Sequence, residues 1–271
     1  MTQNIYDNTY FFQEYSRMER SLLGLAGAPE WPSLRSMLPD LTGARVLDLG
    51  CGFGWFSRWA REQGARSVLA FDVSEKMLHR AIEINSDNAI SYRQMNLEDI
   101  CLPEAGFDLA FSSLTLHYIE NLDRVFESVR HSLIPGGSFV FSTEHPIYTA
   151  PRHPEWLVED EGSRIWPVNQ YLEEGVRVTD WLAKGVVKQH RTIATTLNSL
   201  IRSRFVLTHV DEWGPSDDQI GLHPEWAVHR DRPMFLLVSA KKQRGYESER
   251  STVGRETPYS RHRSATDISS F

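Results

Sequence analysis

One segment constrains this chain more than any other, the run Val46-Leu47-Asp48-Leu49-Gly50-Cys51-Gly52-Phe53-Gly54. It predicts a buried strand that breaks into a glycine turn, and large side chains resume at helical spacing directly afterwards, at Phe56 and Trp59. Glycine is needed where the backbone turns sharply and where a ligand approaches main-chain atoms. A dinucleotide fingerprint would have a third glycine at position 55, which is Trp55 here. The turn therefore predicts a ligand site with a GxGxG pattern.

Two carboxylates accompany the glycine turn. Asp48 lies inside the predicted strand, just before the first glycine, and Asp72 follows the next strand. The position of Asp48 favours an ammonium or sulfonium partner over a phosphate, because opposite charges attract at short range. Asp72 at a strand end can accept hydrogen bonds from both hydroxyls of a ribose.

Short β-branched or aromatic runs alternate with segments of helical period between residues 44 and 240, a pattern typical of a parallel sheet covered by helices. A helix after the fourth strand is expected to begin at an Asn121 N-cap, and a later one buries a face that includes Ile201. The predicted fold class is α/β, doubly wound and mostly parallel, with an antiparallel C-terminal strand pair. The expected strands are Arg45–Leu49, Ser67–Phe71, Ile90–Met95, Phe107–Ser112, Ser138–Ser142, Phe205–Val210 and Met234–Ala240.

Three segments stand apart from this alternation. Residues 1–40 are expected to form an N-terminal helical cap on the main domain, residues 41–240. The insert, residues 144–191, is rich in aromatic residues and ends in a predicted hairpin, so we interpret it as a substrate lid. Ordinary core packing is the alternative for those aromatic residues. Residues 241–271 are rich in Ser, Arg and Glu and are predicted to be disordered.

The charge and the cysteine content of the chain argue against several kinds of partner and site. The net charge is −7 and the body of the chain has no clustered run of Lys and Arg, which argues against a nucleic-acid partner. Cys51 and Cys101 supply neither a disulfide framework nor a set of spaced metal ligands. We find no signal peptide and no apolar run of about 18 residues. A cytoplasmic protein without a membrane span or metal site is expected.

Four motifs occur in order along the chain: the glycine turn, Phe71-Asp72-Val73-Ser74-Glu75-Lys76-Met77-Leu78, Phe107-Asp108-Leu109-Ala110-Phe111-Ser112 and Pro135-Gly136-Gly137. In this order and at these intervals they resemble the class I S-adenosylmethionine-dependent methyltransferases, especially small-molecule enzymes of the ubiquinone-biosynthesis type. The resemblance covers residues 41–142. It implies a Rossmann-like fold, S-adenosyl-L-methionine as cofactor, and methyl transfer to a small-molecule acceptor.

The same resemblance implies roles for residues near the methionine and ribose moieties of the cofactor. Gly50 and Gly52 would let the methionine moiety lie against the backbone, with Asp48 turned toward its ammonium group or an ordered water. Asp72 would hold the ribose diol. A structural bond to the following turn is the alternative for Asp48. Apart from the resemblance, we expect the aromatic N-terminal segment to fold over the cofactor with Tyr6 or Tyr15 near the sulfonium, an arrangement that cation–π attraction favours.

Around the adenine ring, the resemblance places Val73, Met77 and the backbone amide of Leu97. Family members commonly have aspartate where Asn96 stands. An Asn amide oxygen accepts the same hydrogen bond with less charge assistance, so somewhat weaker cofactor binding is expected. Our predicted cofactor-binding set also contains Cys51, Ser112 and His117, although packing is the stronger interpretation for Cys51 and His117.

Acceptor-facing groups should follow the fourth and fifth strands, because ligands bind beyond the carboxyl ends of strands in open α/β sheets. We take His145, Tyr148 and the hairpin residue His190 as candidate catalytic residues, with His145 as the general base. A structural role remains the alternative for both histidines. Methyl transfer is an in-line displacement that depends mainly on positioning, so a base is optional. The residues that follow the two strands are Ser113, Leu116, His117, Tyr118, Glu144, His145, Pro146 and Tyr148.

Other functions are compatible with the same pattern. A nucleotide- or NAD-dependent oxidoreductase would share the strand, glycine turn and acidic pair, but the residue at position 55 and the Pro135-Gly136-Gly137 element count against it. A non-catalytic protein on a methyltransferase scaffold would bind the cofactor or a partner without turnover. A further alternative is a protein that uses S-adenosylmethionine without transferring its methyl group. Fold alone does not decide among these functions.

Overall fold

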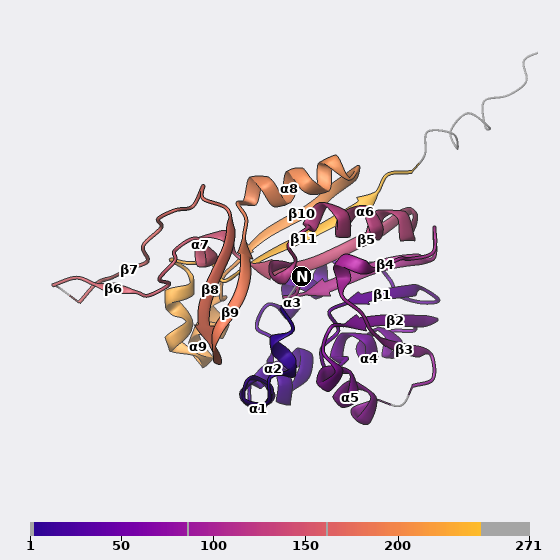
Figure 1. Ribbon diagram of the computed structural model, residues 1–271, viewed down its shortest axis with the longest axis horizontal. Helices are drawn as coiled ribbons and strands as arrows, with labels where there is room; N and C mark the ends of the chain where they lie inside the picture. Colours follow the sequence, from indigo (N-terminus) through magenta and orange to yellow (C-terminus); the bar gives the residue numbers. More distant parts are fainter. Residues whose placement is uncertain (1–2, 86, 161, 245–271) are drawn as a thin grey trace, which may run out of the picture.

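The computed structural model describes residues 3–85, 87–160 and 162–244. Its main sheet has the strand order β10-β11-β5-β4-β1-β2-β3 (Figure 1). β11 runs antiparallel to both β5 and β10, and the other neighbouring strands are parallel. The predicted doubly wound, mostly parallel sheet is confirmed. The strand bounds are β1 Arg45–Leu49, β2 Ser67–Asp72, β3 Ile90–Gln94, β4 Phe107–Ser113, β5 Leu133–Glu144, β10 Phe205–Trp213 and β11 Phe235–Lys242.

The direction in which the sheet grows reverses at β1. The chain first adds β2 and β3 on one side of β1 and then crosses to place β4 on the other side. The loops that follow β1 and β4 run in opposite directions, because the sheet grows away from this point on both sides. Open α/β sheets bind ligands in the gap between two such loops, at the carboxyl ends of the strands. The glycine turn follows β1 and the segment Leu114-Thr115 follows β4, so these two loops border that position.

Helices cover both faces of the sheet. α3 and α4 belong to one apolar cluster, α6 and α8 to the other, and α5 lies against β2 and β3. The predicted N-cap of α6 is confirmed, because the Asn121 side chain accepts a hydrogen bond from the backbone N–H of Arg124. Ile201 was predicted to face the core and is 55% exposed. The bounds are α3 Trp31–Ser36, α4 Trp55–Glu62, α5 Glu75–Ile84, α6 Leu122–Ser132 and α8 Ile193–Arg202.

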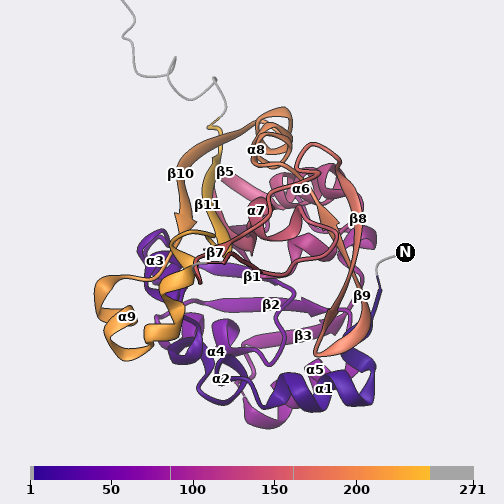
Figure 2. The same cartoon turned by 90° about the vertical axis from the view of Figure 1, so that its left-hand side faces the viewer.

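The N-terminal segment meets the β8–β9 hairpin of the insert. Phe11 and Val186 are fully buried in one small apolar cluster, and both views show α1 near the hairpin (Figure 2). Gln3 fastens this contact: its side-chain amide donates to the carbonyl of Gly185 and accepts from the backbone N–H of Val187. The bounds are η1 Ile5–Asp7, α1 Thr9–Ser16, α2 Glu19–Leu22, η2 Gly24–Gly27, β8 Gly175–Trp181 and β9 Ala183–His190.

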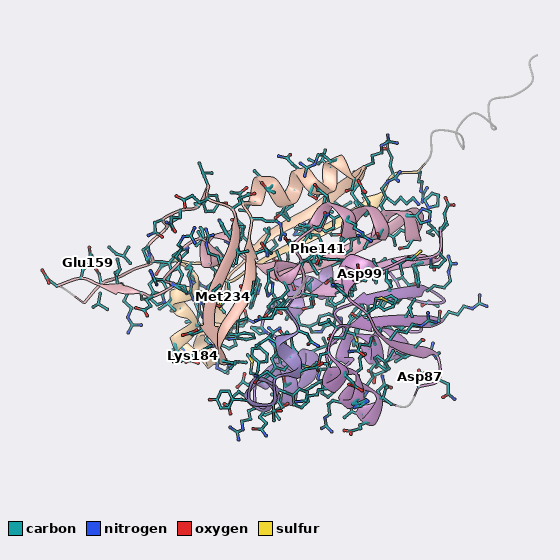
Figure 3. The ribbon with its side chains drawn as sticks, viewed as in Figure 1. Asp87, Asp99, Phe141, Glu159, Lys184 and Met234 are labelled. Atoms are coloured by element: carbon teal, nitrogen blue, oxygen red, sulfur yellow. The ribbon has the colours of Figure 1, made fainter. Side chains whose placement is uncertain are left out.

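Around Leu157–Val158 and Arg164–Ile165 the insert projects from the body of the protein as an arm, with Glu159 at its end (Figure 3). Short elements complete the described chain: η3 Leu97–Asp99, η4 Leu116–Tyr118, α7 Pro146–Thr149, β6 Leu157–Val158, β7 Arg164–Ile165, α9 Asp217–Leu222 and η5 Pro224–His229. Of the segment predicted to be disordered, Lys241 and Lys242 belong to β11, and residues 245–271 lie outside the described residues. Within the described ranges, no helix combines the length and apolar character needed to cross a bilayer.

Candidate functional site

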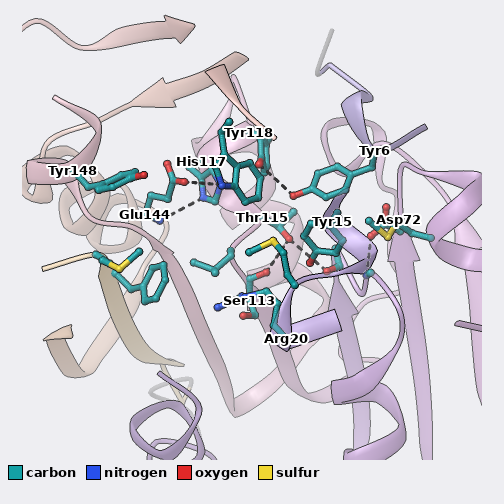
Figure 4. A pocket seen from close by; sticks show the side chains of 18 of the residues that line it. Tyr6, Tyr15, Arg20, Asp72, Ser113, Thr115, His117, Tyr118, Glu144 and Tyr148 are labelled. Atoms are coloured by element: carbon teal, nitrogen blue, oxygen red, sulfur yellow. Dashed lines mark hydrogen bonds and ion pairs between the residues drawn. The ribbon is translucent and has the colours of Figure 1, made fainter. Parts of the chain in front are cut away.

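A cavity of about 430 Å³ opens at the carboxyl ends of β1, β2, β4 and β5. One part of its wall contains the glycine turn and Asp72, and another contains His117, Glu144 and Tyr148. Tyr6 and Tyr15 of the N-terminal segment and Trp181 of the hairpin also line it (Figure 4). The two covering segments therefore enclose the position where the fold places a ligand.

The glycine turn shapes one wall of the cavity. Gly50 has φ of +78°, and a Cβ built on it would lie 2.0 Å from Oγ1 of Thr115. Gly52 has φ of +53°, yet a Cβ there would meet no atom within 4 Å. Gly50 thus keeps the loops after β1 and β4 in contact, whereas Gly52 leaves open space on the cavity side. A ligand can approach the backbone there, as the sequence predicts.

Asp72, the last residue of β2, supports this turn. Its Oδ2 accepts a hydrogen bond of 2.8 Å from the backbone N–H of Gly52, and its Oδ1 accepts one of 2.9 Å from Ser74. Burial raises the pKa of Asp72 to about 6, although these hydrogen bonds oppose the shift. Each carboxylate oxygen keeps a second lone pair, so Asp72 can accept bonds from a diol in the cavity without losing these contacts.

Asp48 and Cys51 do not line the cavity. Asp48 is 1% exposed and accepts a 2.6 Å hydrogen bond from the hydroxyl of Ser57 in α4. Burial raises its pKa to about 7. Cys51 packs against the apolar cluster around α4, and burial raises the pKa of its thiol well above the usual value. Packing, the alternative for Cys51, agrees with these contacts, whereas Asp48 makes its structural bond to α4 rather than to the following turn.

Four residues border the cavity beyond Asp72, where the resemblance places the adenine ring: Val73, Met77, Asn96 and Leu97. Asn96 is the N-cap of η3, because its side-chain oxygen accepts a 3.1 Å bond from the N–H of Glu98. Met77 is 1% exposed and belongs to α5. The four residues that the resemblance places around the adenine ring therefore lie in the lining of the same cavity.

The N-terminal segment is fixed to the beginning of α5. Asp7 Oδ1 accepts a 2.6 Å hydrogen bond from the Ser74 hydroxyl and a 3.2 Å bond from the backbone N–H of Lys76, at the beginning of α5. These bonds lower the pKa of Asp7 against a raising contribution from burial. A carboxylate at a helix N-terminus is also favoured by the helix dipole. Tyr6 directly before Asp7 and Tyr15 after it reach the cavity from this anchored segment.

At the other end of the cavity, Glu144 is the last residue of β5 and His117 lies in η4. The backbone N–H of Glu144 donates a 3.4 Å bond to His117 Nδ1, and His117 Nε2 lies 4.0 Å from Glu144 Oε1. Burial lowers the pKa of His117 to about 4, so its ring is neutral at neutral pH. Lys188 of β9 places its ammonium 2.5 Å from the same Oε1. Sequence reasoning missed Lys188, although period-two alternation puts it on the same face as His190.

His145 and His190 lie outside the cavity wall. The His145 ring is fully buried: Nδ1 accepts from the N–H of Ile147 as the N-cap of α7, and Nε2 lies 2.8 Å from Glu212 Oε1. The His190 ring lies between the Thr149 hydroxyl, at 2.8 Å, and a main-chain carbonyl. Both ring nitrogens of each histidine lie within hydrogen-bond distance of protein groups. The structure therefore does not support the predicted catalytic roles of His145 and His190. Tyr148 does line the cavity.

Ser112, predicted in the cofactor site, is also buried away from the cavity. Its hydroxyl donates a 2.8 Å bond to the carbonyl of Leu49, which joins the ends of β4 and β1. Ser113, one residue later, faces the cavity because side chains alternate along a strand. A shift of one position along β4 therefore separates a side chain that lines the cavity from one that makes a buried structural bond.

Two arginines in or near the cavity wall lie outside the set of site residues that the sequence predicts. Arg20 of α2 lines the cavity, and its Nη2 lies 3.0 Å from Oε1 of Glu30, a residue that is 1% exposed. Arg232 lies against three aromatic rings of the insert, at 4.2 to 5.1 Å from their centroids. These rings are Tyr148, Trp156 and Trp166. Such cation–π contacts hold the insert on the segment that precedes β11.

Comparisons with known proteins agree with this geometry. Residues 47–141 match the family model for a methyltransferase domain. An S-adenosylmethionine-dependent methyltransferase from Mesorhizobium loti is 59% identical, covers 80% of this chain and 100% of its own, and superimposes with a TM-score of 0.78. A proposed S-adenosylmethionine-dependent methyltransferase from Listeria monocytogenes is 40% identical over 80% of this chain and 99% of its own, with a TM-score of 0.73.

A curated relative covers less of the chain. The malonyl-[acyl-carrier protein] O-methyltransferase of Pectobacterium atrosepticum is 34% identical over 110 residues, which are 41% of this chain and 42% of that protein. The chain thus spans less than half the length of this relative. The two structures matched over most of their length carry the assignment, and they favour neither an oxidoreductase nor a non-catalytic protein. The chain belongs to the class I S-adenosylmethionine-dependent methyltransferases, and S-adenosylmethionine is its cofactor.

Proposed function

We propose that this methyltransferase acts on a small molecule held in the part of the cavity that contains Glu144 and Tyr148. The single observation that carries this proposal is the continuity of the cavity from Asp72 to Tyr148 beneath the N-terminal segment and the β8–β9 hairpin. A covered cavity admits a compact molecule more readily than a folded protein or a nucleic acid.

The residues present fit the cofactor. The open space beside Gly52 accommodates its methionine moiety against the backbone, and Asp72 has free lone pairs for the ribose hydroxyls. Val73 and Met77 flank the position of the adenine, with Asn96 and Leu97 at its edge.

The electron-rich faces of Tyr6 and Tyr15 lie where a cationic ligand would be stabilised. When bound, the cofactor supplies a methyl group attached to a sulfonium, which is a reactive leaving group in a displacement. The protein then contributes chiefly by holding the acceptor in line and excluding water, and well-oriented reactants gain about 7 to 11 kcal/mol over free ones.

We further propose that residues 1–40 and the insert, residues 144–191, act together as the cover of the acceptor. Tyr148 and Trp181 come from the insert, and Trp213 and Phe235 come from the ends of β10 and β11. This aromatic wall favours an acceptor with a flat apolar part.

Two measurements test the proposal. Calorimetric titration with S-adenosylhomocysteine and with NADH should give saturable binding of the first ligand alone. The protein is then incubated with S-adenosylmethionine and fractionated metabolites, and formation of S-adenosylhomocysteine is followed with a boiled-protein control. Methylation found only in fractions of protein or RNA would contradict a small-molecule acceptor.

A further inference from the structure

The acceptor end of the cavity contains a carboxylate that is only half satisfied. Glu144 Oε1 receives the Lys188 ammonium at 2.5 Å, but Glu144 Oε2 is buried and has no hydrogen-bond partner within the part of the chain that the structure describes. The Glu144 side chain is 13% exposed. A buried acceptor without a donor is unfavourable, and more so when it is charged. Glu144, which lines the cavity, therefore keeps one acceptor oxygen that no donor of the described residues fills.

The position of this oxygen is fixed by its neighbours. The Lys188 side chain is 3% exposed, and its ammonium also lies 4.9 Å from the centroid of the Trp181 ring. The neutral His117 ring borders the same carboxylate on the other side, and Figure 4 shows Glu144 between His117 and Tyr148. Burial raises the pKa of Glu144 and the adjacent Lys188 ammonium lowers it, with a net shift downward. Glu144 is therefore ionised and can only accept.

We propose that Glu144 is a catalytic residue that accepts a hydrogen bond from an uncharged O–H or N–H group of the acceptor and takes its proton during methyl transfer. This inference rests on the proposed function, because it names the acceptor chemistry of the same cavity. The acceptor oxygen or nitrogen forms the new bond to the methyl carbon, and the carbon–sulfur bond breaks with its electron pair remaining on sulfur. The proton of the acceptor passes to Glu144 Oε2 and from there to solvent.

The charges around Glu144 favour an acceptor group that carries no net charge. Lys188 already neutralises Glu144, so an ammonium acceptor would add an unbalanced positive charge beside Lys188. A carboxylate acceptor would face the unpaired oxygen of Glu144, and like charges repel strongly in a site of low dielectric. Arg20 does not offset that repulsion, because Glu30 holds its guanidinium. A hydroxyl or a ring N–H can donate a hydrogen bond to Oε2 without adding a net charge to the site.

Binding of simple probes tests this recognition without turnover. Phenol, aniline, benzoate and protonated benzylamine are each titrated at millimolar concentrations into the protein saturated with S-adenosylhomocysteine. Phenol or aniline should bind best, and comparison of these two distinguishes an O–H from an N–H acceptor. Tighter binding of benzoate or benzylamine, or no binding of any probe, overturns the proposal.

Substitution links the recognition to Glu144. Glu144→Gln keeps the shape of the side chain but adds a donor, and it should weaken binding of the preferred probe at least about tenfold, since a charge-assisted bond is lost. Glu212→Gln is the matched control, because Glu212 bonds to His145 outside the cavity. Both variants should bind S-adenosylhomocysteine as the unsubstituted protein does. Equal probe affinity in Glu144→Gln and the control would refute the assignment.

Turnover provides the second readout. With the acceptor found by metabolite fractionation, Glu144→Gln should lower kcat at least about 100-fold, which is the lower bound for loss of a general base, while Glu212→Gln retains it. An unchanged kcat in Glu144→Gln would overturn the catalytic role. If no small molecule is methylated but the probes bind in a Glu144-dependent way, the proposed function fails and the recognition by Glu144 stands.

Discussion

The Tyr6 hydroxyl lies 3.2 Å from the Tyr118 hydroxyl, which joins the N-terminal segment to the loop after β4 across the cavity. The Tyr6 ring also makes edge contacts with the rings of Phe11 and Tyr15. Asp7 and Gln3 anchor the same segment on either side of Tyr6. These contacts therefore fix the position of the Tyr6 ring in the cavity wall.

Substitution of Tyr6 should separate the hydrogen bond from the ring. Tyr6→Phe removes one neutral hydrogen bond, worth about 1 kcal/mol, and should lower the melting temperature slightly with little change in affinity for S-adenosylhomocysteine. Tyr6→Ala also removes the ring from the cavity wall and should weaken binding. Titration calorimetry of both variants measures the difference, and equal affinities would show that the Tyr6 ring does not contact the ligand.

Asp72→Ala should cost about 1.5 to 3 kcal/mol of affinity for S-adenosylhomocysteine, because charge-assisted hydrogen bonds to the ribose are lost. It also frees the N–H of Gly52, which Asp72 now holds. Asp72→Asn keeps one acceptor oxygen, so its affinity for S-adenosylhomocysteine should lie between those of the unsubstituted protein and Asp72→Ala. Unchanged affinity in a folded Asp72→Ala variant would refute the ribose assignment.

The two glycines of the turn should respond differently to alanine. Gly50→Ala forces Thr115 to move and places a side chain at positive φ, so it should destabilise the protein before any ligand is added. Gly52→Ala has free space in the protein and should cost only about 1 to 2 kcal/mol for its backbone conformation. Its methyl group enters the space proposed for the ligand, so affinity should fall. Thermal unfolding and titration calorimetry on both variants test this contrast.

Asp48 should make stability depend on pH. Its pKa rises from 3.8 to about 7 on folding, so the folded state holds the proton more tightly and stability falls as the pH rises through that interval. The full penalty at higher pH is roughly 4 kcal/mol. Asp48→Asn should therefore raise the melting temperature more at pH about 8 than at pH about 5. Asp218→Asn, at an exposed carboxyl of α9, is the control and should show no such trend.

His145→Ala should act on stability and leave catalysis unchanged. The substitution removes the N-cap of α7 and the partner of Glu212, and a lost cap alone costs about 1 kcal/mol. Melting temperature and turnover per folded molecule are measured together. A large loss of turnover with normal stability and cofactor binding would restore His145 as a base.

The strands and the cofactor end could be predicted because their signals are local. Gly50, Gly52 and Asp72 belong to strand ends, and parallel strands bring their carboxyl ends to one edge of the sheet. Asp48 shows the limit of this reasoning: the chain predicts a carboxylate near the turn, but its bond to Ser57 depends on how α4 packs.

The acceptor end could not be predicted in the same way. Lys188 reaches Glu144 only because the hairpin of the insert folds back onto the sheet, 44 residues further along the chain. His145 was favoured for its usual pKa and its place after β5. Its ring instead bonds to the N–H of Ile147, a local contact that depends on the following helix.

The position of Arg232 against Tyr148, Trp156 and Trp166 has a consequence for redesign of this enzyme. The insert is not an independent module, since its rings rest on the cation of Arg232, which lies 66 positions after Trp166 and 84 after Tyr148. A chimaera that exchanges the insert with that of a relative would leave Arg232 facing unrelated side chains. Exchange of acceptor preference between relatives therefore requires the insert and the segment before β11 to be transplanted as a pair.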